Sequence, residues 1–135
     1  MDTREVVERY YATVNAGDWE TWLTVFDEHV VVDEQLAGHL EGVGAMKQEA
    51  DAIRAAYPTF RMDPEHVVVE GQEACAIWHC TAVSTGGAPV DARGTNYFRV
   101  VEGRIAYLAN FHDKGAFAPA SQPASQPASQ EPSRP

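Results

Sequence analysis

Four long β-prone segments follow one another in the second half of the chain. They span residues 60–70, 73–85, 90–101 and 104–111. The separators Glu70-Gly71, Gly86-Gly87 and Glu102-Gly103 have the composition of tight turns between antiparallel strands. Such a meander has one face to bury, and the rest of the chain must cover that face.

Helical patterns precede the meander. Apolar residues recur at helical spacing over residues 3–16 and 43–57, which predicts two amphipathic helices. Gly17 ends the first helix in the position that glycine favours, and Pro58 stops the second. A short helix capped by Asp18 is expected to carry four apolar side chains on one side: Trp19, Trp22, Leu23 and Phe26.

A β-rich run over residues 29–35 and a loop over residues 36–42 lie between these helices. Helices followed by a strand meander indicate the α+β class rather than alternating α/β units. We therefore expect three N-terminal helices packed into a curved, mostly antiparallel sheet. This arrangement makes a cone-shaped α+β barrel with a cavity at its mouth.

The C-terminal segment differs in composition from the rest. Residues 119–130 repeat Pro-Ala-Ser-Gln three times, and residues 131–135 continue in the same manner. A segment of this kind buries too little apolar surface to offset the entropy of ordering it. We expect one domain over residues 1–117 and a disordered tail over residues 118–135 that has no catalytic role.

The charge balance excludes several partners. The chain has 10 basic and 20 acidic residues and a formal net charge of −10, which argues against nucleic acid and against an anionic membrane surface. No apolar run approaches the roughly 20 residues that span a bilayer. The N-terminus has no apolar signal region, so the expected location is the cytoplasm.

Metal-ligating residues are scattered. The five histidines have no close ligand spacing, so we expect neither a metal nor a cofactor. Cys75 and Cys80 are five residues apart on a predicted strand, which places them on opposite faces of the sheet. They are interpreted as small apolar residues rather than as a disulfide.

Several strings resemble the nuclear-transport-factor-2-like superfamily, and most closely its SnoaL-like polyketide cyclases and ketosteroid isomerases. These strings lie at residues 8–18, 31–33, 40–42, 93–100 and 102–105. The resemblance covers about residues 3–117 and implies the cone fold with one small-molecule pocket. It is specific for the fold and less so for the function, because one fold hosts many activities.

The resemblance also implies site residues. Tyr10 matches the oxyanion-donating tyrosine of the isomerases, and Asp33 matches their general base. Asn96 stands where the isomerases carry a neutral aspartic acid, and an amide can also donate a hydrogen bond there. The cyclases often carry an acid/base aspartate after the last strand, and Asp113 has that place. Asp33 and Asp113 therefore remain two candidate bases. Tyr11 is the alternative to Tyr10 if the helical register is shifted by one.

The alternation of side chains along the strands adds further residues to the predicted site. If Asn96 faces the pocket, Phe98 does too. The Gly86-Gly87 turn sets a register that turns alternate residues of the preceding strand inward and turns Trp78 outward. Because this superfamily commonly dimerises through the outer sheet face, Trp78 is an interface candidate and a homodimer is expected. The expected pocket residues are His79, which is either an acid/base group or a satisfied core histidine, together with Trp22, Phe26, Ile77, Thr81, Phe98 and His112.

Two functions follow from this set. The first is a cofactor-independent isomerase, cyclase or dehydratase that acts on a small hydrophobic carbonyl compound such as a polyketide or terpenoid. Asp33 or Asp113 removes a proton, while Tyr10 and Asn96, with His79, stabilise the oxyanion. The alternative is a non-catalytic module that binds a small ligand or dimerises. A connected void with polar groups at its base favours the enzyme, and a filled cone favours the module.

Overall fold

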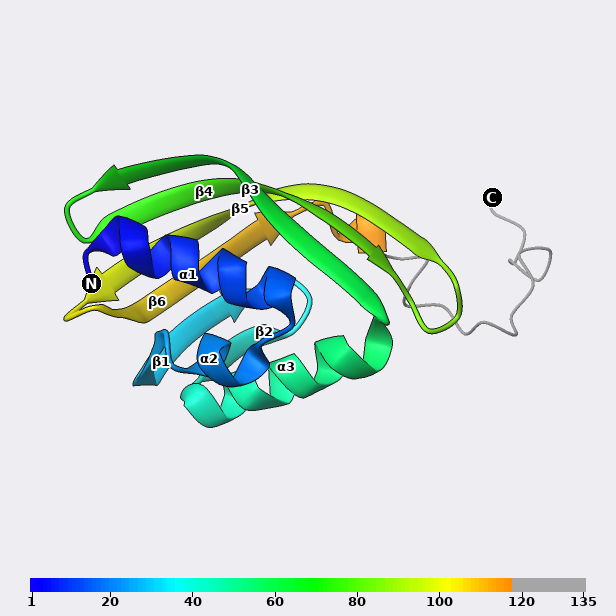
Figure 1. Ribbon diagram of the computed structural model, residues 1–135, viewed down its shortest axis with the longest axis horizontal. Coiled ribbons are helices and arrows are strands. Elements are labelled where there is room, and N and C mark those ends of the chain that lie inside the picture. The colour runs from blue at the N-terminus through cyan, green and yellow to red at the C-terminus, as the bar shows by residue number, and fades with distance from the viewer. Residues whose placement is uncertain (118–135) are drawn as a thin grey trace, which may run out of the picture.

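Three helices and a curved six-stranded sheet form the computed structural model, which describes residues 1–117 (Figure 1). The tail predicted over residues 118–135 lies outside the described residues. The elements in chain order are α1 (Thr3–Ala16), α2 (Trp19–Leu23), β1 (Phe26–Glu34), β2 (Gly38–Glu41), α3 (Val43–Ala56), β3 (Thr59–Glu70), β4 (Glu73–Val83), β5 (Pro89–Val101), β6 (Arg104–His112) and the 3₁₀ helix η1 (Lys114–Phe117).

Local signals at its two ends define α1. The Asp2 carboxylate accepts a hydrogen bond from the backbone N–H of Glu5, whose own carboxylate accepts one from the backbone N–H of Asp2. Gly17 ends the helix in the left-handed conformation at φ 68°. The helix buries one face against the sheet: Val6, Val7, Tyr10, Tyr11, Thr13 and Val14. This helix is as predicted.

The sheet is open, and its strand order is β2-β1-β6-β5-β4-β3. The pair β1–β6 is parallel and all other neighbours are antiparallel. The predicted α+β cone with three helices is confirmed. Two local predictions are wrong. The expected loop over residues 36–42 contains the edge strand β2, and Phe26 begins β1 instead of lying on the second helix.

The register of β4 is shifted by one residue from the prediction. Asn96 of β5 lies opposite Ala76, so Ala76 and Trp78 share the concave face with it. Trp78 is fully buried, whereas Ile77 is 44% exposed on the outer face. The loop between the two strands is closed by a hydrogen bond from Ser84 N to Ala88 O and is longer than the predicted turn. A slip of one residue exchanges the two faces of a strand.

Trp78 is therefore part of the core, and its predicted place at an outer interface is wrong. Its indole ring lies over Gly94 of β5. A Cβ atom at Gly94 would meet this ring and would also lie 2.6 Å from the carbonyl oxygen of Phe111. Glycine is required here because the Trp78 ring and the Phe111 backbone approach this position closely. The prediction that Cys75 and Cys80 lie on opposite faces is confirmed, since Cys75 is exposed and Cys80 is buried.

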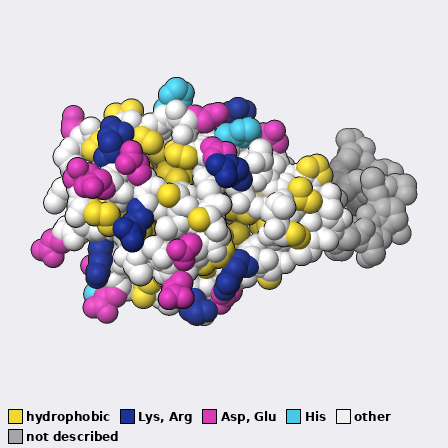
Figure 2. Space-filling model, viewed as in Figure 1, with side chains coloured by type: hydrophobic (Ala, Val, Ile, Leu, Met, Phe, Trp, Pro, Cys, Tyr) yellow, Lys and Arg dark blue, Asp and Glu magenta, His cyan; other side chains and the backbone are white. Residues whose placement is uncertain are grey.

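Acidic and basic side chains are interspersed over the face shown in Figure 2, without a large patch of one sign. None of the described helices is long and apolar enough to cross a membrane.

Candidate functional site

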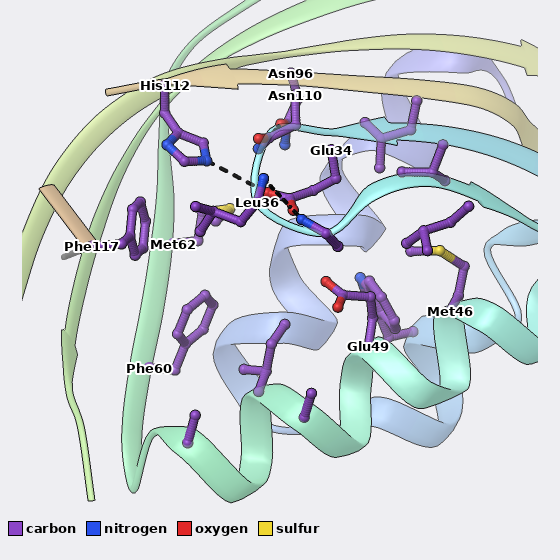
Figure 3. A pocket seen from close by; sticks show the side chains of 18 of the residues that line it. Glu34, Leu36, Met46, Glu49, Phe60, Met62, Asn96, Asn110, His112 and Phe117 are labelled. Atoms are coloured by element: carbon purple, nitrogen blue, oxygen red, sulfur yellow. Dashed lines mark hydrogen bonds and ion pairs between the residues drawn. The ribbon is translucent and has the colours of Figure 1, made fainter. Parts of the chain in front are cut away.

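A cavity of about 350 Å³ opens between α3 and the concave face of the sheet (Figure 3). Its walls are mainly apolar and aromatic: Tyr10, Trp22, Val32, Leu36, Leu40, Met46, Ile53, Tyr57, Phe60, Met62, Leu108 and Phe117. Its other polar lining residues are Glu34, Glu49, Asn96, Asn110 and His112. A connected void with convergent polar groups is the arrangement expected of a ligand site.

Glu34 is the last residue of β1 and points to the same side as Val32, which is buried. Its Oε2 atom accepts hydrogen bonds from the backbone N–H groups of Leu36, at 2.9 Å, and of Ala37. Its Oε1 atom lies 3.5 Å from Nε2 of His112. The side chain is only 18% exposed, so a carboxylate in a fixed orientation is present in an apolar cavity.

His112 is the last residue of β6, opposite Gly94. Its side chain is 2% exposed. The ring packs against Trp78 and Phe117, with ring centroids 5.9 and 4.8 Å apart. The Nδ1 atom has no hydrogen-bond partner among the described residues. The imidazole is thus held by packing, while Nε2 faces Glu34.

Glu49 projects from α3, and its carboxylate points into the cavity (Figure 3). Burial raises the pKa of this carboxyl, and the negative charge of Glu34 raises it further. Neither a hydrogen bond nor an ion pair joins the carboxylate to a residue of the described part of the chain. The cavity therefore contains one carboxylate held by the backbone and a second one without a partner.

Tyr10 lines the cavity and is 8% exposed. Burial is the main cause of its raised pKa, and the charges of Glu34 and Glu49 add to the effect. The phenol therefore stays protonated and can donate a hydrogen bond. Tyr11, the alternative to Tyr10, does not line the cavity.

A hydrogen-bond chain crosses the floor of the cavity. The Nδ2 atom of Asn96 donates to the hydroxyl of Tyr11 at 2.8 Å, and Nδ2 of Asn110 donates to Oδ1 of Asn96 at 3.1 Å. Asn96 and Asn110 face each other across β5 and β6. The Oδ1 atom of Asn110 has no partner among the described residues. The chain fixes both amides with their polar atoms at the cavity.

The cavity contains four of the predicted site residues: Tyr10, Trp22, Asn96 and His112. The predicted position of Asp33 in the pocket is wrong. Its side chain points away from the cavity, where Oδ2 accepts a hydrogen bond from Tyr107 at 2.6 Å and Oδ1 lies 2.7 Å from Nδ1 of His39. These hydrogen bonds, that of Tyr107 first, lower the pKa of Asp33.

The other predicted site residues also lie outside the cavity. His79, Ile77 and Thr81 are on the outer face because of the register shift, and His79 Nε2 lies 2.7 Å from Oδ1 of Asp91 there. Asp113 is exposed, and its Oδ1 accepts a hydrogen bond from the backbone N–H of Gly115 at 2.8 Å. Two further residues are buried in the core without lining the cavity: Phe26 and Phe98.

Three acidic or amide residues of the cavity lining were not predicted: Glu34, Glu49 and Asn110. Parity contained a signal for Glu34, because it is two residues from Val32 and four from Val30. No group of three His, Cys, Asp or Glu side chains that could hold a metal ion occurs in residues 1–117.

The comparisons with known proteins agree with this fold. A family model described as a SnoaL-like domain matches residues 7–108. No curated protein matches the chain.

Among solved structures, a nuclear-transport-factor-2-like protein of unknown function from Burkholderia pseudomallei is 12% identical with a TM-score of 0.82, over 90% of this chain and 99% of that one. A Pseudomonas putida protein provisionally described as a polyketide cyclase is 20% identical with a TM-score of 0.76, over 87% and 96%. A Catenulispora acidiphila protein with a ketosteroid isomerase-like fold, in complex with trimethylamine, is 13% identical with a TM-score of 0.80, over 93% and 98%. At these identities the likeness shows the fold alone.

Proposed function

The chain belongs to the SnoaL-like domain family, and from this premise we propose that its cavity is the active site of an acid/base enzyme acting on a small apolar carbonyl compound. The observation that carries the proposal is the Glu34 carboxylate, held in an apolar cavity beside His112. A relative provisionally described as a polyketide cyclase has the same fold. The proposed chemistry uses side chains alone and needs no cofactor.

Glu34 is the proposed base, in place of Asp33 or Asp113. Two backbone N–H groups occupy its Oε2 atom, which leaves Oε1 to receive a proton. The C–H bond next to the substrate carbonyl breaks, its electron pair moves into the carbonyl to give an enolate, and the proton passes to Oε1. His112, 3.5 Å from Oε1, then contacts the protonated carboxyl.

The enolate oxygen needs a hydrogen-bond donor. Tyr10 is the proposed donor, because its phenol lines the cavity and its raised pKa keeps it protonated. Asn96 is proposed as a second donor, since only one of its two amide hydrogens is used by Tyr11. Return of the proton to another carbon isomerises the substrate. Attack of the enolate carbon on a second carbonyl of the substrate cyclises it, and the new alkoxide takes the proton back from Glu34. Loss of a β-hydroxyl group, which takes that proton and leaves as water, dehydrates it.

The test of this function needs no knowledge of the natural substrate. The full chain is incubated in D₂O with cyclohexanone or 2-indanone, and exchange of the protons next to the carbonyl is followed by NMR. We expect exchange above the buffer rate, and we expect Glu34→Gln to reduce it by about 100-fold or more.

Asp33→Asn is the matched control, because it removes the same charge from the adjacent residue outside the cavity. It should keep the exchange activity. Equal exchange by the wild type and Glu34→Gln would remove Glu34 from the role. Binding of these ketones without any exchange would favour the non-catalytic ligand-binding module instead.

We also propose that the protein is a homodimer through its outer sheet face. Ile77 of β4 and Phe111 of β6 both lie opposite Thr95 of β5 on this face, and they are 44% and 56% exposed. Exposed apolar side chains in register across a sheet favour association. Light scattering of the full chain should give twice the chain mass, and a monomer mass would contradict this proposal.

A further inference from the structure

Acidic side chains outnumber basic ones in the cavity wall. Among the described residues, the lining includes the carboxylates of Glu34 and Glu49 and the imidazole of His112, but no lysine and no arginine. We propose that the cavity binds a small organic cation, a protonated amine whose nitrogen lies between Glu34 and Glu49 and whose apolar part contacts the aromatic walls. This inference deepens the proposed function and rests on it, because it adds an amine group to the carbonyl substrate that the same cavity would bind.

The first argument is electrostatic. The two carboxylates face one cavity, and the negative charge of Glu34 acts on both Glu49 and Tyr10. Glu49 has no cationic partner among the described residues, in contrast to Asp51 on the same helix, which is paired with Lys47 at 2.9 Å and Arg54 at 2.7 Å. A ligand ammonium would supply the opposite charge that the protein leaves out, in a site where solvent screens the attraction only in part.

The second argument is the aromatic lining. Five aromatic residues surround the cavity: Tyr10, Trp22, Tyr57, Phe60 and Phe117. The ring centroids of Tyr10 and Trp22 are 5.8 Å apart, and those of Tyr57 and Phe60 are 5.6 Å apart. Ring faces attract cations because of their quadrupole, and aromatic walls with a nearby carboxylate suit alkylammonium groups. An anionic ligand would meet repulsion from both carboxylates.

The third argument comes from polar atoms without partners. Trp22 is 2% exposed and lines the cavity, yet its Nε1 atom makes no hydrogen bond to a described residue. The Oδ1 atom of Asn110 likewise has no hydrogen-bond partner among the described residues. A buried polar group without a partner costs free energy, and both atoms belong to residues that line the cavity. The ligand ammonium can donate to Oδ1 of Asn110, whereas the indole N–H of Trp22 needs an acceptor, which the carbonyl oxygen of the substrate would supply.

The experiment compares three probes of similar shape and different charge. Cyclohexylmethylamine is cationic at pH 7, cyclohexylmethanol is neutral, and cyclohexanecarboxylate is anionic. Their dissociation constants for the full-length protein are measured by titration calorimetry. We expect the amine to bind at least about tenfold more tightly than the alcohol, and the carboxylate to bind most weakly.

Two variants test whether Glu49 causes the preference for the amine. Glu49→Gln should reduce the affinity of the amine to about that of the alcohol while leaving the alcohol unchanged. Asp51→Asn removes the same charge from the same helix outside the cavity, and it should preserve the preference for the amine. A loss of preference in both variants would mean that the net charge alone selects the cation, and it would overturn the proposal.

The inference and the proposed function can fail separately. Equal affinities of the amine and the alcohol for the wild type would overturn the inference and leave proton abstraction by Glu34 standing. A preference for the amine without any ketone exchange would support the inference and remove the enzymatic function. Failure of all three probes to bind would overturn the inference as well.

Discussion

Each side of the sheet near the end of β1 carries a histidine and two carboxylates, and the two groups differ in how far their hydrogen bonds are completed. In the outer group, His39 lies between Asp33 and Glu41, at 2.7 and 2.8 Å. In the inner group, His112 contacts Glu34 at 3.5 Å. Glu49 has no such contact in the described part of the chain. Every member of the outer group has a side-chain partner, whereas in the inner group Glu49 and Nδ1 of His112 have none among the described residues.

The difference follows from exposure. The side chains of His39 and Asp33 are 55% and 49% exposed, so water screens their charges and the pair adds little to stability. Those of His112 and Glu34 are 2% and 18% exposed, so an unmatched charge or polar atom there is costly. A site that leaves such groups unmatched within the protein is arranged for a ligand. The outer group, although it resembles a catalytic constellation, is complete without one.

The largest expected loss of stability comes from a substitution on the tightly packed concave face of the sheet. Gly94→Ala would press a methyl group against Trp78 and the backbone oxygen of Phe111. Because Trp78 also packs against His112, the substitution should displace the floor of the cavity. We expect the free energy of unfolding to fall by about 3 kcal/mol. Urea denaturation followed by tryptophan fluorescence measures this loss.

Gly44→Ala is the matched control on the outside of the molecule. Gly44 is in α3, and a Cβ atom there would meet nothing within 4 Å. Alanine is the better helix former, so this variant should be more stable by about 0.5–1 kcal/mol. A Gly94→Ala variant as stable as the wild type would contradict this prediction, because it would show that the concave face accommodates a methyl group as well as the exposed side of α3 does.

The order of elements was predictable because local chemistry determines it. The repeated apolar spacing of α1 and α3 and the glycine turns of the meander are visible in the sequence, and each works over a few residues. The register of β4 was not predictable in this way. Its two faces both carry apolar side chains, such as Ala76 inside and Ile77 outside, so alternation does not distinguish them. Only the length of the loop closed by Ser84 and Ala88 decides the register.

The residues of the cavity were predictable only in part. Tyr10 and Asn96 were assigned to the pocket by resemblance, and both line the cavity. Asp33 was assigned as a candidate base by resemblance, and the unbroken run of valines before it hides the alternation that turns Glu34 inward. Glu49 is one polar residue on a helix with many, and only its place opposite β1 distinguishes it. Such long-range packing has no local signal.

The smallest expected effects are on stability at different pH values, where removal of the inner carboxyl should stabilise the protein and removal of the outer histidine should destabilise it. The raised pKa of Glu49 means that ionisation costs stability in the folded state, starting as the pH rises above its ordinary value of 4.5. Glu49→Gln should therefore match the wild type near pH 4 and be more stable at pH 6 and 9, by less than about 1 kcal/mol. Urea unfolding at the three pH values measures this difference.

His39→Ala should change stability in the opposite direction, by destabilising the protein at low pH. Hydrogen bonds to Asp33 and Glu41 raise the pKa of His39, so its contribution is fully present below the ordinary value of 6.5 and is lost as the pH rises through the folded value. The variant should be less stable than the wild type at pH 6 and equal to it at pH 9. A Glu49→Gln variant that loses stability at pH 9 would mean that the protein itself supplies Glu49 with a partner. The inner group would then be as complete as the outer one, and the reason to expect a cationic ligand would disappear with the difference between them.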